Sequence, residues 1–377
     1  MMDIAIIGGG IGGLATANAL HKIGLQPHVY EQASSFQPVG ASIGIGSNAM
    51  LALQQIGVAN NIIKAGMPLH EQRFLDEHLH VMNTIDFTLL KKRFGEENIA
   101  IQRADLHEAL FHNVDKSFIH FSLQVRQIKQ TNNEVLVSFN NGVTKSFDYV
   151  IAADGIHSLI RQSLLPNSKP RFANYTCWRG TSRNKGDVLA HISSEAWSKQ
   201  GRFGWAPLYN GDVYWFACIN SSENDEYYHS LDQLGVASLF SHYPEPVERL
   251  IRETSETSFL HHDLYDIKPL DSFVYGRVLL IGDAAHATTP NMGQGAGQSI
   301  EDAYELMLAL KEANTVQEAF SRYDVRRVKK TKKVIQLSRQ IGWAAQWDHP
   351  FLVKFRNTVF PYIPKSLLFQ RLTFLFK

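Results

Sequence analysis

The sequence of 377 residues lacks most features that mark secreted, metal-binding or membrane-spanning proteins. It has only two cysteines, Cys177 and Cys218, which form neither a CxxC motif nor a cluster with histidine. Such thiols are expected to be buried in a reducing compartment and to take no part in a disulfide framework. The sixteen histidines show no metal-ligand spacing, so no metal site is predicted. No stretch approaches the ~20 apolar residues that a membrane-spanning helix needs.

Charge of one sign is also missing. There are 37 Lys and Arg against 36 Asp and Glu, so no overall field attracts nucleic acid or an anionic membrane. The one basic cluster, residues 326–333, alternates with apolar residues at helical spacing and is interpreted as a solvated helix face, with a phosphate or nucleic-acid contact as the alternative. The apolar first twenty residues include Asp3 and several glycines and lack a basic leader, so we expect no export signal and a cytoplasmic location.

The sequence does contain a dinucleotide fingerprint. The apolar run 3–7 leads into GGGIGG at 8–13, and Glu31 ends a second apolar run eighteen residues after this segment. The glycines have separate tasks: Gly8 permits a tight turn, Gly10 lets a pyrophosphate approach the backbone, and Gly13 lets the following helix pack closely. The N–H groups at the start of that helix then hold phosphates. The fingerprint alone leaves NAD and FAD as alternatives.

Periodicity predicts an α/β fold that a different region interrupts. We expect helices over 11–23, 48–57 with Asn48 as N-cap, 103–112, 297–311 and 315–338. We expect strands within 71–86, a hairpin turned at 140–142, and buried strands at 149–153 and 277–281. Residues 39–46 are too rich in glycine for an ordinary strand and are expected to lie as backbone against a flat group. The aromatic-rich, alternating segment 171–269 predicts an antiparallel sheet.

Two later motifs bear on the cofactor. Asp154-Gly155 stands where a buried strand ends and a helix begins, so its carboxylate can accept a hydrogen bond from a cofactor hydroxyl. Gly282-Asp283 is followed by Pro290 and by the sequence GQGAG at 293–297. Such a glycine turn presents backbone N–H groups at a helix N-terminus to an electron-rich group.

With these motifs in this order, the chain resembles the class A flavoprotein monooxygenases, the para-hydroxybenzoate hydroxylase-like superfamily. The likeness covers about residues 1–340. The segments WRG at 178–180, GRFG at 201–204 and VYWFA at 213–217 are most similar to the branch that holds salicylate, 3-hydroxybenzoate and urate hydroxylases and zeaxanthin epoxidase.

The resemblance implies an extended FAD bound by a Rossmann-like domain of the GR2 type, interrupted by the antiparallel substrate domain and followed by C-terminal helices. The FAD-binding domain would comprise residues 1–70, 99–170 and 270–340, the substrate domain 71–98 and 171–269, and a helical tail 341–377. The residues implied in FAD binding are Gly8, Gly10, Gly12 and Gly13 at the phosphates, Glu31, Gln32 and Val125 at the adenosine, Arg103, Asp154 and Asp283 along the middle, and Ser42, Ile43, Pro290, Gly293, Gln294, Gly295, Ala296 and Gly297 at the isoalloxazine.

The resemblance also implies a reaction. NAD(P)H would reduce the flavin, O2 would add to form a C4a-hydroperoxide, and one oxygen atom would pass to a small aromatic, heteroaromatic or conjugated substrate. Water must be kept out of such a site. Arg202 and Tyr214 are the catalytic candidates, with structural pairing or core packing as the alternative for each. His286 is interpreted as a structural part of its motif.

Three alternatives stay open at this stage. The same fold could serve a flavin reductase or dehydrogenase, or an FAD-loaded protein that binds a ligand without turnover. An NAD-only dehydrogenase explains neither Asp154 nor Asp283. The apolar tail after Asp348 is expected to pack on the protein, with a membrane surface or a subunit contact as the alternative. We expect a monomer or homodimer without stable membrane insertion.

Overall fold

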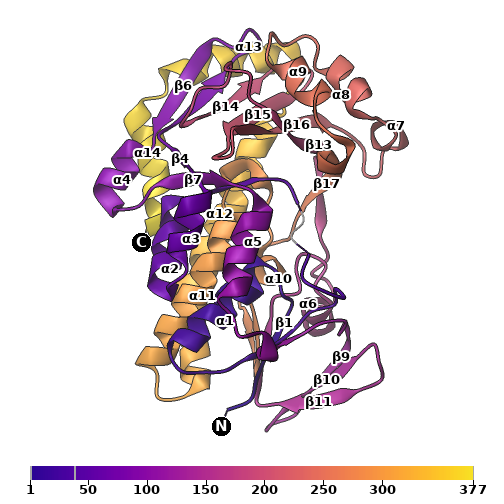
Figure 1. The fold of residues 1–377 in the computed structure, drawn as a ribbon, viewed down its shortest axis with the longest axis vertical. Helices are drawn as coiled ribbons and strands as arrows, with labels where there is room; N and C mark the ends of the chain where they lie inside the picture. The colour runs from indigo at the N-terminus through magenta and orange to yellow at the C-terminus, as the bar shows by residue number, and fades with distance from the viewer. Residues whose placement is uncertain (1, 38–39, 377) are drawn as a thin grey trace.

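The computed structural model describes residues 2–37 and 40–376, and a six-stranded sheet organises its lower part (Figure 1). The strand order is β18-β19-β12-β1-β2-β8. The central strand β1 (Ile4–Ile7) is parallel to both of its neighbours, and its four residues are all buried. The other strands are β2 (His28–Tyr30), β8 (Ile119–His120), β12 (Tyr149–Ala152), β18 (Val274–Tyr275) and β19 (Val278–Leu280). This sheet confirms the α/β prediction.

Helices cover one face of this sheet and a small antiparallel sheet lies beside it (Figure 1). The fingerprint helix α1 (Ile11–Lys22) packs against α11 (Gly295–Glu312) and α5 (Arg103–His112), and α11 packs against α2 (Ser47–Ile56) and the long α12 (Val316–Ala345). The small sheet comprises β9 (Val125–Gln130), β10 (Val135–Phe139) and β11 (Thr144–Phe147). The hairpin predicted at 140–142 joins β10 to β11. Of two short helices, α3 (Ala59–Ala65) packs against α5 and α2, whereas α6 (Leu159–Leu164) packs against β9.

A seven-stranded sheet forms the upper part. Its order is β17-β13-β16-β15-β14-β5-β6. The strands are β17 (Leu260–Asp266), β13 (Arg171–Arg183), β16 (Asp212–Asn220), β15 (Arg202–Pro207), β14 (Ile192–Trp197), β5 (Glu71–Leu75) and β6 (Val81–Asp86). One face packs Trp178, Phe203 and Trp215 with apolar residues of α8 (Gln233–Leu239) and α9 (Val247–Arg252), near α7 (Glu226–His229). Because side chains alternate along strands, the other face carries a separate set of residues.

A three-stranded sheet corrects one prediction. Residues 43–45 form a regular strand, β3 (Ile43–Ile45), which pairs with β7 (Asn98–Ile101), and β7 also pairs with β4 (Met67–Leu69). The glycine content suggested otherwise, but Gly44 is exposed and tolerated because β3 needs only backbone pairing with β7. Val39, at the start of the segment considered in the sequence, lies outside the described residues.

The helices near the C-terminus wrap the outside of the upper sheet. Helix α12 runs without a break through residue 340 to Ala345, and α13 (Pro350–Val359) and α14 (Lys365–Thr373) follow. Figure 1 shows α13 across the top of the molecule and α14 beside α4 (Thr88–Phe94). Within the described part of the chain, no helix is both long and apolar enough to span a membrane.

Candidate active site

The turn between β1 and α1 leaves space for a ligand in front of a helix N-terminus. Gly8 has φ +106°, and a Cβ there would lie 2.4 Å from the carbonyl oxygen of Ala153, so only glycine fits. A Cβ on Gly13 would lie 1.9 Å from the Gly8 carbonyl, so glycine lets α1 start close to β1. In contrast, a Cβ on Gly10 meets no atom within 4 Å. The first N–H groups of α1, including that of Gly12, have no acceptor within the helix.

An acidic side chain lies beside this turn. Glu31 follows β2, and its two carboxylate oxygens accept backbone N–H groups of Gly9 (2.6 Å) and Ala33 (2.8 Å). Each oxygen retains a further lone pair. Gln32 is exposed next to it, and the backbone just before Val125, where β9 begins, donates to the Glu31 carbonyl (2.9 Å). The structure thus brings the adenosine-end candidates to one edge of the sheet.

The candidates for the middle of the cofactor are polar groups with unused bonding capacity. Oδ2 of Asp154 accepts from the Ile160 N–H (3.3 Å), while its Oδ1 is buried without a partner among the described residues. Asp283 begins α10 (Asp283–His286); its side chain is reached by solvent but lies in a hollow where partial dehydration raises the pKa of the carboxyl. The Arg103 guanidinium acts in the opposite direction on that pKa, and it lies beside Gly40.

The second glycine turn repeats the arrangement of the first. A 3-10 turn (Pro290–Met292) leads to Gly293 at φ +62°, where a Cβ would meet no atom within 4 Å. Helix α11 then begins, so its first N–H groups lack intrahelical acceptors; they belong to Gly295, Ala296 and Gly297. Gly46, which follows β3, lies beside this turn, because a Cβ on Gly46 would lie 3.0 Å from Nε2 of Gln294. Ser42 is buried and Ile43 begins β3, the strand that leads to Gly46.

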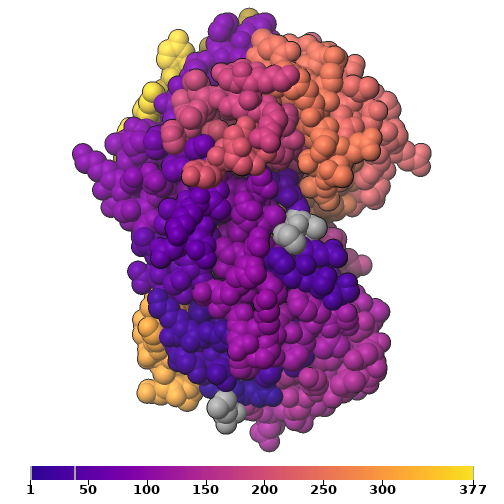
Figure 2. Space-filling model, in the orientation of Figure 1, coloured from indigo at the N-terminus to yellow at the C-terminus, as the bar shows by residue number. Residues whose placement is uncertain are grey.

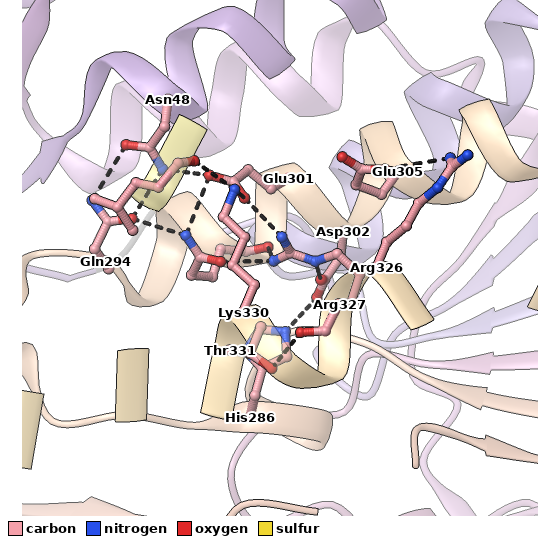
Figure 3. A network of polar contacts seen from close by, with 12 residues as sticks. Asn48, His286, Gln294, Glu301, Asp302, Glu305, Arg326, Arg327, Lys330 and Thr331 are labelled. Atoms are coloured by element: carbon pink, nitrogen blue, oxygen red, sulfur yellow. Dashed lines mark hydrogen bonds and ion pairs between the residues drawn. The ribbon is translucent and has the colours of Figure 1, made fainter. Parts of the chain in front are cut away.

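A buried charged network holds this turn in place (Figure 3). Asp302 of α11 accepts from the backbone N–H of Gly282 (2.7 Å), contacts Nε2 of His286 (2.5 Å), and accepts from Nε of Arg327 (2.7 Å). Arg327 also pairs with Glu301 (2.7 Å). Although burial opposes ionisation, the charges of His286 and Arg327 hold the pKa of Asp302 well below its usual range. The structural interpretation of His286 agrees with these contacts.

This network overturns two details of the sequence prediction. Arg327, predicted on a solvated face, is only 1% exposed, because carboxylates of α11 face that side of α12. Asn48 does not cap α2: the cap position is Gly46, and the Asn48 side chain donates to Gln294 (3.0 Å) and also contacts Glu301. Sequence reasoning missed Asp302 altogether. Its signal is weak, because Glu301 and Asp302 are adjacent acidic residues in a helix that also carries Gln298, Ser299 and Glu305.

The free face of the seven-stranded sheet meets the second glycine turn through Arg202. This side chain is 2% exposed; it donates to Glu195 (3.0 Å), contacts Asn291 of the 3-10 turn, and lies 5.3 Å from the ring centre of Tyr175. Asn291 in turn donates to Tyr175 (3.0 Å) and to the backbone of α12 at Ser338 (2.8 Å). Arg202 therefore connects sheet, turn and helix.

Tyr214 lies on the same sheet face as Arg202, farther along β16. Register places Thr181 and Ala206 on either side of Tyr214, which packs near Leu69 and Ala100. Burial raises the pKa of its hydroxyl above the ordinary value, so the group stays protonated at neutral pH and can donate a hydrogen bond.

Cationic groups converge near Tyr214. The charge of Arg179 acts on both Tyr214 and His262, and the charge of Arg103 also acts on His262, whose pKa is lowered mainly by burial. His262 on β17 and Asp283 at the start of α10 are thus both within reach of the Arg103 charge. Cys177 and Cys218 lie opposite each other on this face, and both thiols are buried, as the sequence predicted. Among the described residues no group of three His, Cys, Asp or Glu is placed to hold a metal ion.

A cavity of about 640 Å³ is lined by Asn291 and Tyr175. Its wall near the end of α12 and the start of α13 combines the apolar side chains Trp343, Trp347 and Leu352 with polar ones such as Gln346 and Asp348. Figure 2 shows that the outline of the molecule narrows where the upper and lower parts meet.

These features fit an extended dinucleotide. There is open space in front of two helix N-termini. One buried carboxylate oxygen of Asp154 has no hydrogen-bond donor among the described residues. The exposed carboxylate of Asp283 and the exposed guanidinium of Arg103 likewise make no side-chain hydrogen bond within the described part of the chain. The two helix ends suit two electron-rich groups, the phosphates and the flavin edge.

Comparison with known proteins agrees with this assignment. The chain is 31% identical over 350 residues to the aurachin C monooxygenase/isomerase of Stigmatella aurantiaca, covering 93% of this chain and 91% of that protein. It is 30% identical over 374 residues to the 2-heptyl-3-hydroxy-4(1H)-quinolone synthase of Pseudomonas aeruginosa, covering 97% and 95%. The structure of Klebsiella pneumoniae HpxO complexed with FAD and uric acid is similar in fold, with a TM-score of 0.90, 24% identity and coverage of 97% and 94%.

A family model described as an FAD binding domain matches residues 1–338. The predicted resemblance is thereby confirmed. The chain belongs to this FAD-binding family of class A flavin monooxygenases and is an FAD-dependent enzyme that uses NAD(P)H as electron donor.

Proposed function

We propose that this enzyme oxygenates a fused heteroaromatic ring that carries an apolar chain, of the 2-alkyl-4(1H)-quinolone type. The observation that carries the proposal is the cavity of about 640 Å³ lined by Tyr175 and Asn291, which Arg202 links to the sheet face, and on its outer side by Trp343, Trp347 and Leu352. One relative with 30% identity over nearly its whole length has a 2-heptyl-quinolone in its name. In this proposal the planar ring of the substrate lies between the seven-stranded sheet and the flavin, and its alkyl chain lies in the cavity.

The proposed FAD site runs from α1 to α11. The N–H groups at Gly10–Gly13 hold the pyrophosphate, Glu31 the ribose, and Arg103, Asp154 and Asp283 the chain between the two ring systems. Residues 293–297, with β3, hold the isoalloxazine. Bound FAD, reduced by NAD(P)H, supplies the activation of O2. The division into an FAD-binding and a substrate domain at the predicted boundaries belongs to the same proposal.

The protein's own contribution is to hold charge and exclude water. A quinolone becomes more nucleophilic at ring carbon as negative charge moves toward its carbonyl oxygen. The Tyr214 hydroxyl, kept protonated by burial, donates to that oxygen, and the cation of Arg179 stabilises the charge. Apolar side chains around Tyr214 keep water out.

Arg202 acts through other residues in this proposal. Its two terminal nitrogens are engaged by Glu195 and Asn291, and its guanidinium lies over the Tyr175 ring, so it positions the 3-10 turn under the substrate ring. The conservative variant Arg202→Lys cannot bridge both partners. We expect it to lower kcat while FAD stays bound.

A turnover screen tests the substrate class. The FAD-loaded enzyme is given NADH or NADPH with 2-heptyl-4(1H)-quinolone, 2-methyl-4(1H)-quinolone, urate and salicylate, and product mass is measured with and without O2. We expect quinolone-stimulated NAD(P)H oxidation and a product heavier by one oxygen atom only with O2. Stimulation by urate or salicylate alone would contradict the quinolone assignment. Reduction of the quinolone without O2 would contradict oxygenation itself.

Filling the cavity tests where the chain lies. Ser221 lines the cavity, and its buried hydroxyl has no partner among the described residues. We expect Ser221→Leu to raise KM for the 2-heptyl compound about tenfold, as one or two displaced methylene contacts would. The 2-methyl compound is the internal control and should keep its KM. Equal effects on both compounds would place the chain elsewhere.

A further inference from the structure

Helix α13 exposes its apolar side, whereas a helix on a protein surface usually buries that side and exposes its polar one. Phe351, Phe355 and Val359 recur at intervals of four residues and are 69%, 53% and 43% exposed. The opposite side is inward and includes Arg356, which is 6% exposed and donates to the carbonyl of Ala345 (2.7 Å). The apolar side of this helix therefore has no partner within the described chain.

Exposed apolar side chains are also frequent on either side of α13 in the sequence. Trp343, which lines the same cavity as Leu352, is 68% exposed, and Tyr362 is 82% exposed. Among the described residues, nineteen large apolar side chains are exposed, and eight of them lie between 341 and 367. Isolated exposed apolar residues are ordinary, but such a concentration marks an interaction surface. We call the exposed apolar side chains of this segment the α13 face; they are Ile341, Trp343, Phe351, Leu352, Phe355, Val359, Tyr362 and Leu367.

Charge in the segment that follows Asp348 has one sign. No Asp or Glu occurs in it, whereas Lys354, Lys365 and Arg371 are all exposed. A symmetric dimer through this face would bring these cations against their own copies, and this segment supplies no acid to offset the repulsion. Lipid headgroups that carry negative charge offer the complementary partner, and Trp, Tyr and Phe are the side chains that favour the boundary between headgroups and acyl chains.

We propose that the α13 face docks on an anionic lipid surface. Helix α13 lies in the plane of the interface with Phe351 and Phe355 inserted among the acyl chains and Lys354 at headgroup level. This is peripheral binding by one helix face and needs no spanning segment.

The α13 face also contains the mouth of the cavity described above. Trp343 and Leu352 belong to both. If the proposed function holds, a substrate with an alkyl chain, which partitions into lipid, enters the cavity directly from the membrane. Docking itself does not depend on that function, because it rests on the exposed residues alone.

Vesicle flotation of the full-length, FAD-loaded protein tests the proposal. Vesicles of phosphatidylcholine are compared with an equal mixture of phosphatidylcholine and phosphatidylglycerol. We expect clear binding to the anionic vesicles, weakened by salt, and at least about tenfold less binding to the neutral ones. Absence of binding to anionic vesicles at low salt would overturn the proposal.

Matched variants locate the contact. We expect F351S/F355S to lose at least about tenfold in vesicle affinity with unchanged FAD content. The control is Y227S/L234S, in which both replaced side chains are 59% exposed on another part of the surface, and it should bind as the parent does. The charge variant K354E/K365E should lose binding to anionic vesicles, while K64E/K311E should not. Equal vesicle binding by F351S/F355S and its control would overturn the proposal. It would also be overturned if the parent bound no vesicles but sedimented as a dimer, and F351S/F355S sedimented as a monomer.

Discussion

The two ends of the proposed FAD site have the same structural feature, a glycine turn before a helix, but different contacts hold the turn in place at each end. At each end a glycine turn leads into a helix whose first N–H groups face open space. The α1 end is fixed by backbone contact, because Gly8 and Gly13 allow approaches that no side chain would permit. The α11 end is fixed by buried charge from Asp302 and Arg327. Backbone contact is a local property, whereas buried charge depends on residues distant in the chain.

The largest expected effect comes from breaking the charge at the α11 end. Asp302→Asn leaves Arg327 and His286 without their shared carboxylate in a site with no solvent access. Removing one partner of a buried pair costs about 3–5 kcal/mol. We expect that loss in the free energy of unfolding, measured by denaturant titration of the apoprotein.

A surface pair is the control for this loss. Arg252 contacts Glu248 on α9 with 59% of its side chain exposed. Arg252→Met should change the free energy of unfolding by less than about 0.5 kcal/mol. A similar loss in both variants would show that the buried network has no special weight in holding the second turn.

The same contrast explains what the sequence could predict. The β1–turn–α1 unit follows from a contiguous pattern, and the structure has its helix at Ile11–Lys22 against the predicted 11–23. The support of α11 joins residues 302 and 327, and the contact between Arg202 and Asn291 joins elements 89 residues apart. No local pattern encodes such pairs. For this reason the sequence predicts Arg327 as one of several cations on a solvated helix face, although the side chain is buried.

The second expected effect sharpens the comparison at the α1 end. Gly10→Ala adds a methyl group to space that is empty in the protein, at an ordinary φ of −74°. We expect unchanged apoprotein stability but FAD affinity weaker by about tenfold to a hundredfold, since the methyl group stands where a pyrophosphate would lie. The measurement is fluorescence titration of FAD.

Gly8→Ala is the matching variant and should behave differently. Its strained φ of +106° and the 2.4 Å approach to a carbonyl predict a loss of apoprotein stability before any FAD is added. If Gly10→Ala also destabilised the apoprotein, or left FAD affinity intact, the space in front of α1 would not be the cofactor site.

A smaller effect is expected on the sheet face. Tyr214→Phe removes one hydrogen-bond donor and keeps the ring that packs near Leu69 and Ala100. We expect kcat/KM to fall about tenfold, corresponding to roughly 1.4 kcal/mol, with FAD content unchanged. Tyr209→Phe, at a position 67% exposed, is the control. A larger fall for Tyr209 than for Tyr214 would remove Tyr214 from the proposed site.

The smallest effect concerns pH and returns to Asp302. The pKa of its carboxyl is lowered in the folded protein. The carboxyl therefore contributes its full share of the unfolding free energy above its pKa in the unfolded chain, about 3.9, and this share is lost as the pH falls below that pKa. Between pH 7 and pH 5 the difference in unfolding free energy between the parent and Asp302→Asn should therefore change by less than about 0.3 kcal/mol. Below pH 4 the difference should shrink, because the parent's carboxylate then becomes protonated on unfolding. A difference that shrinks already between pH 7 and pH 5 would mean that another group in the network carries the charge that holds α11.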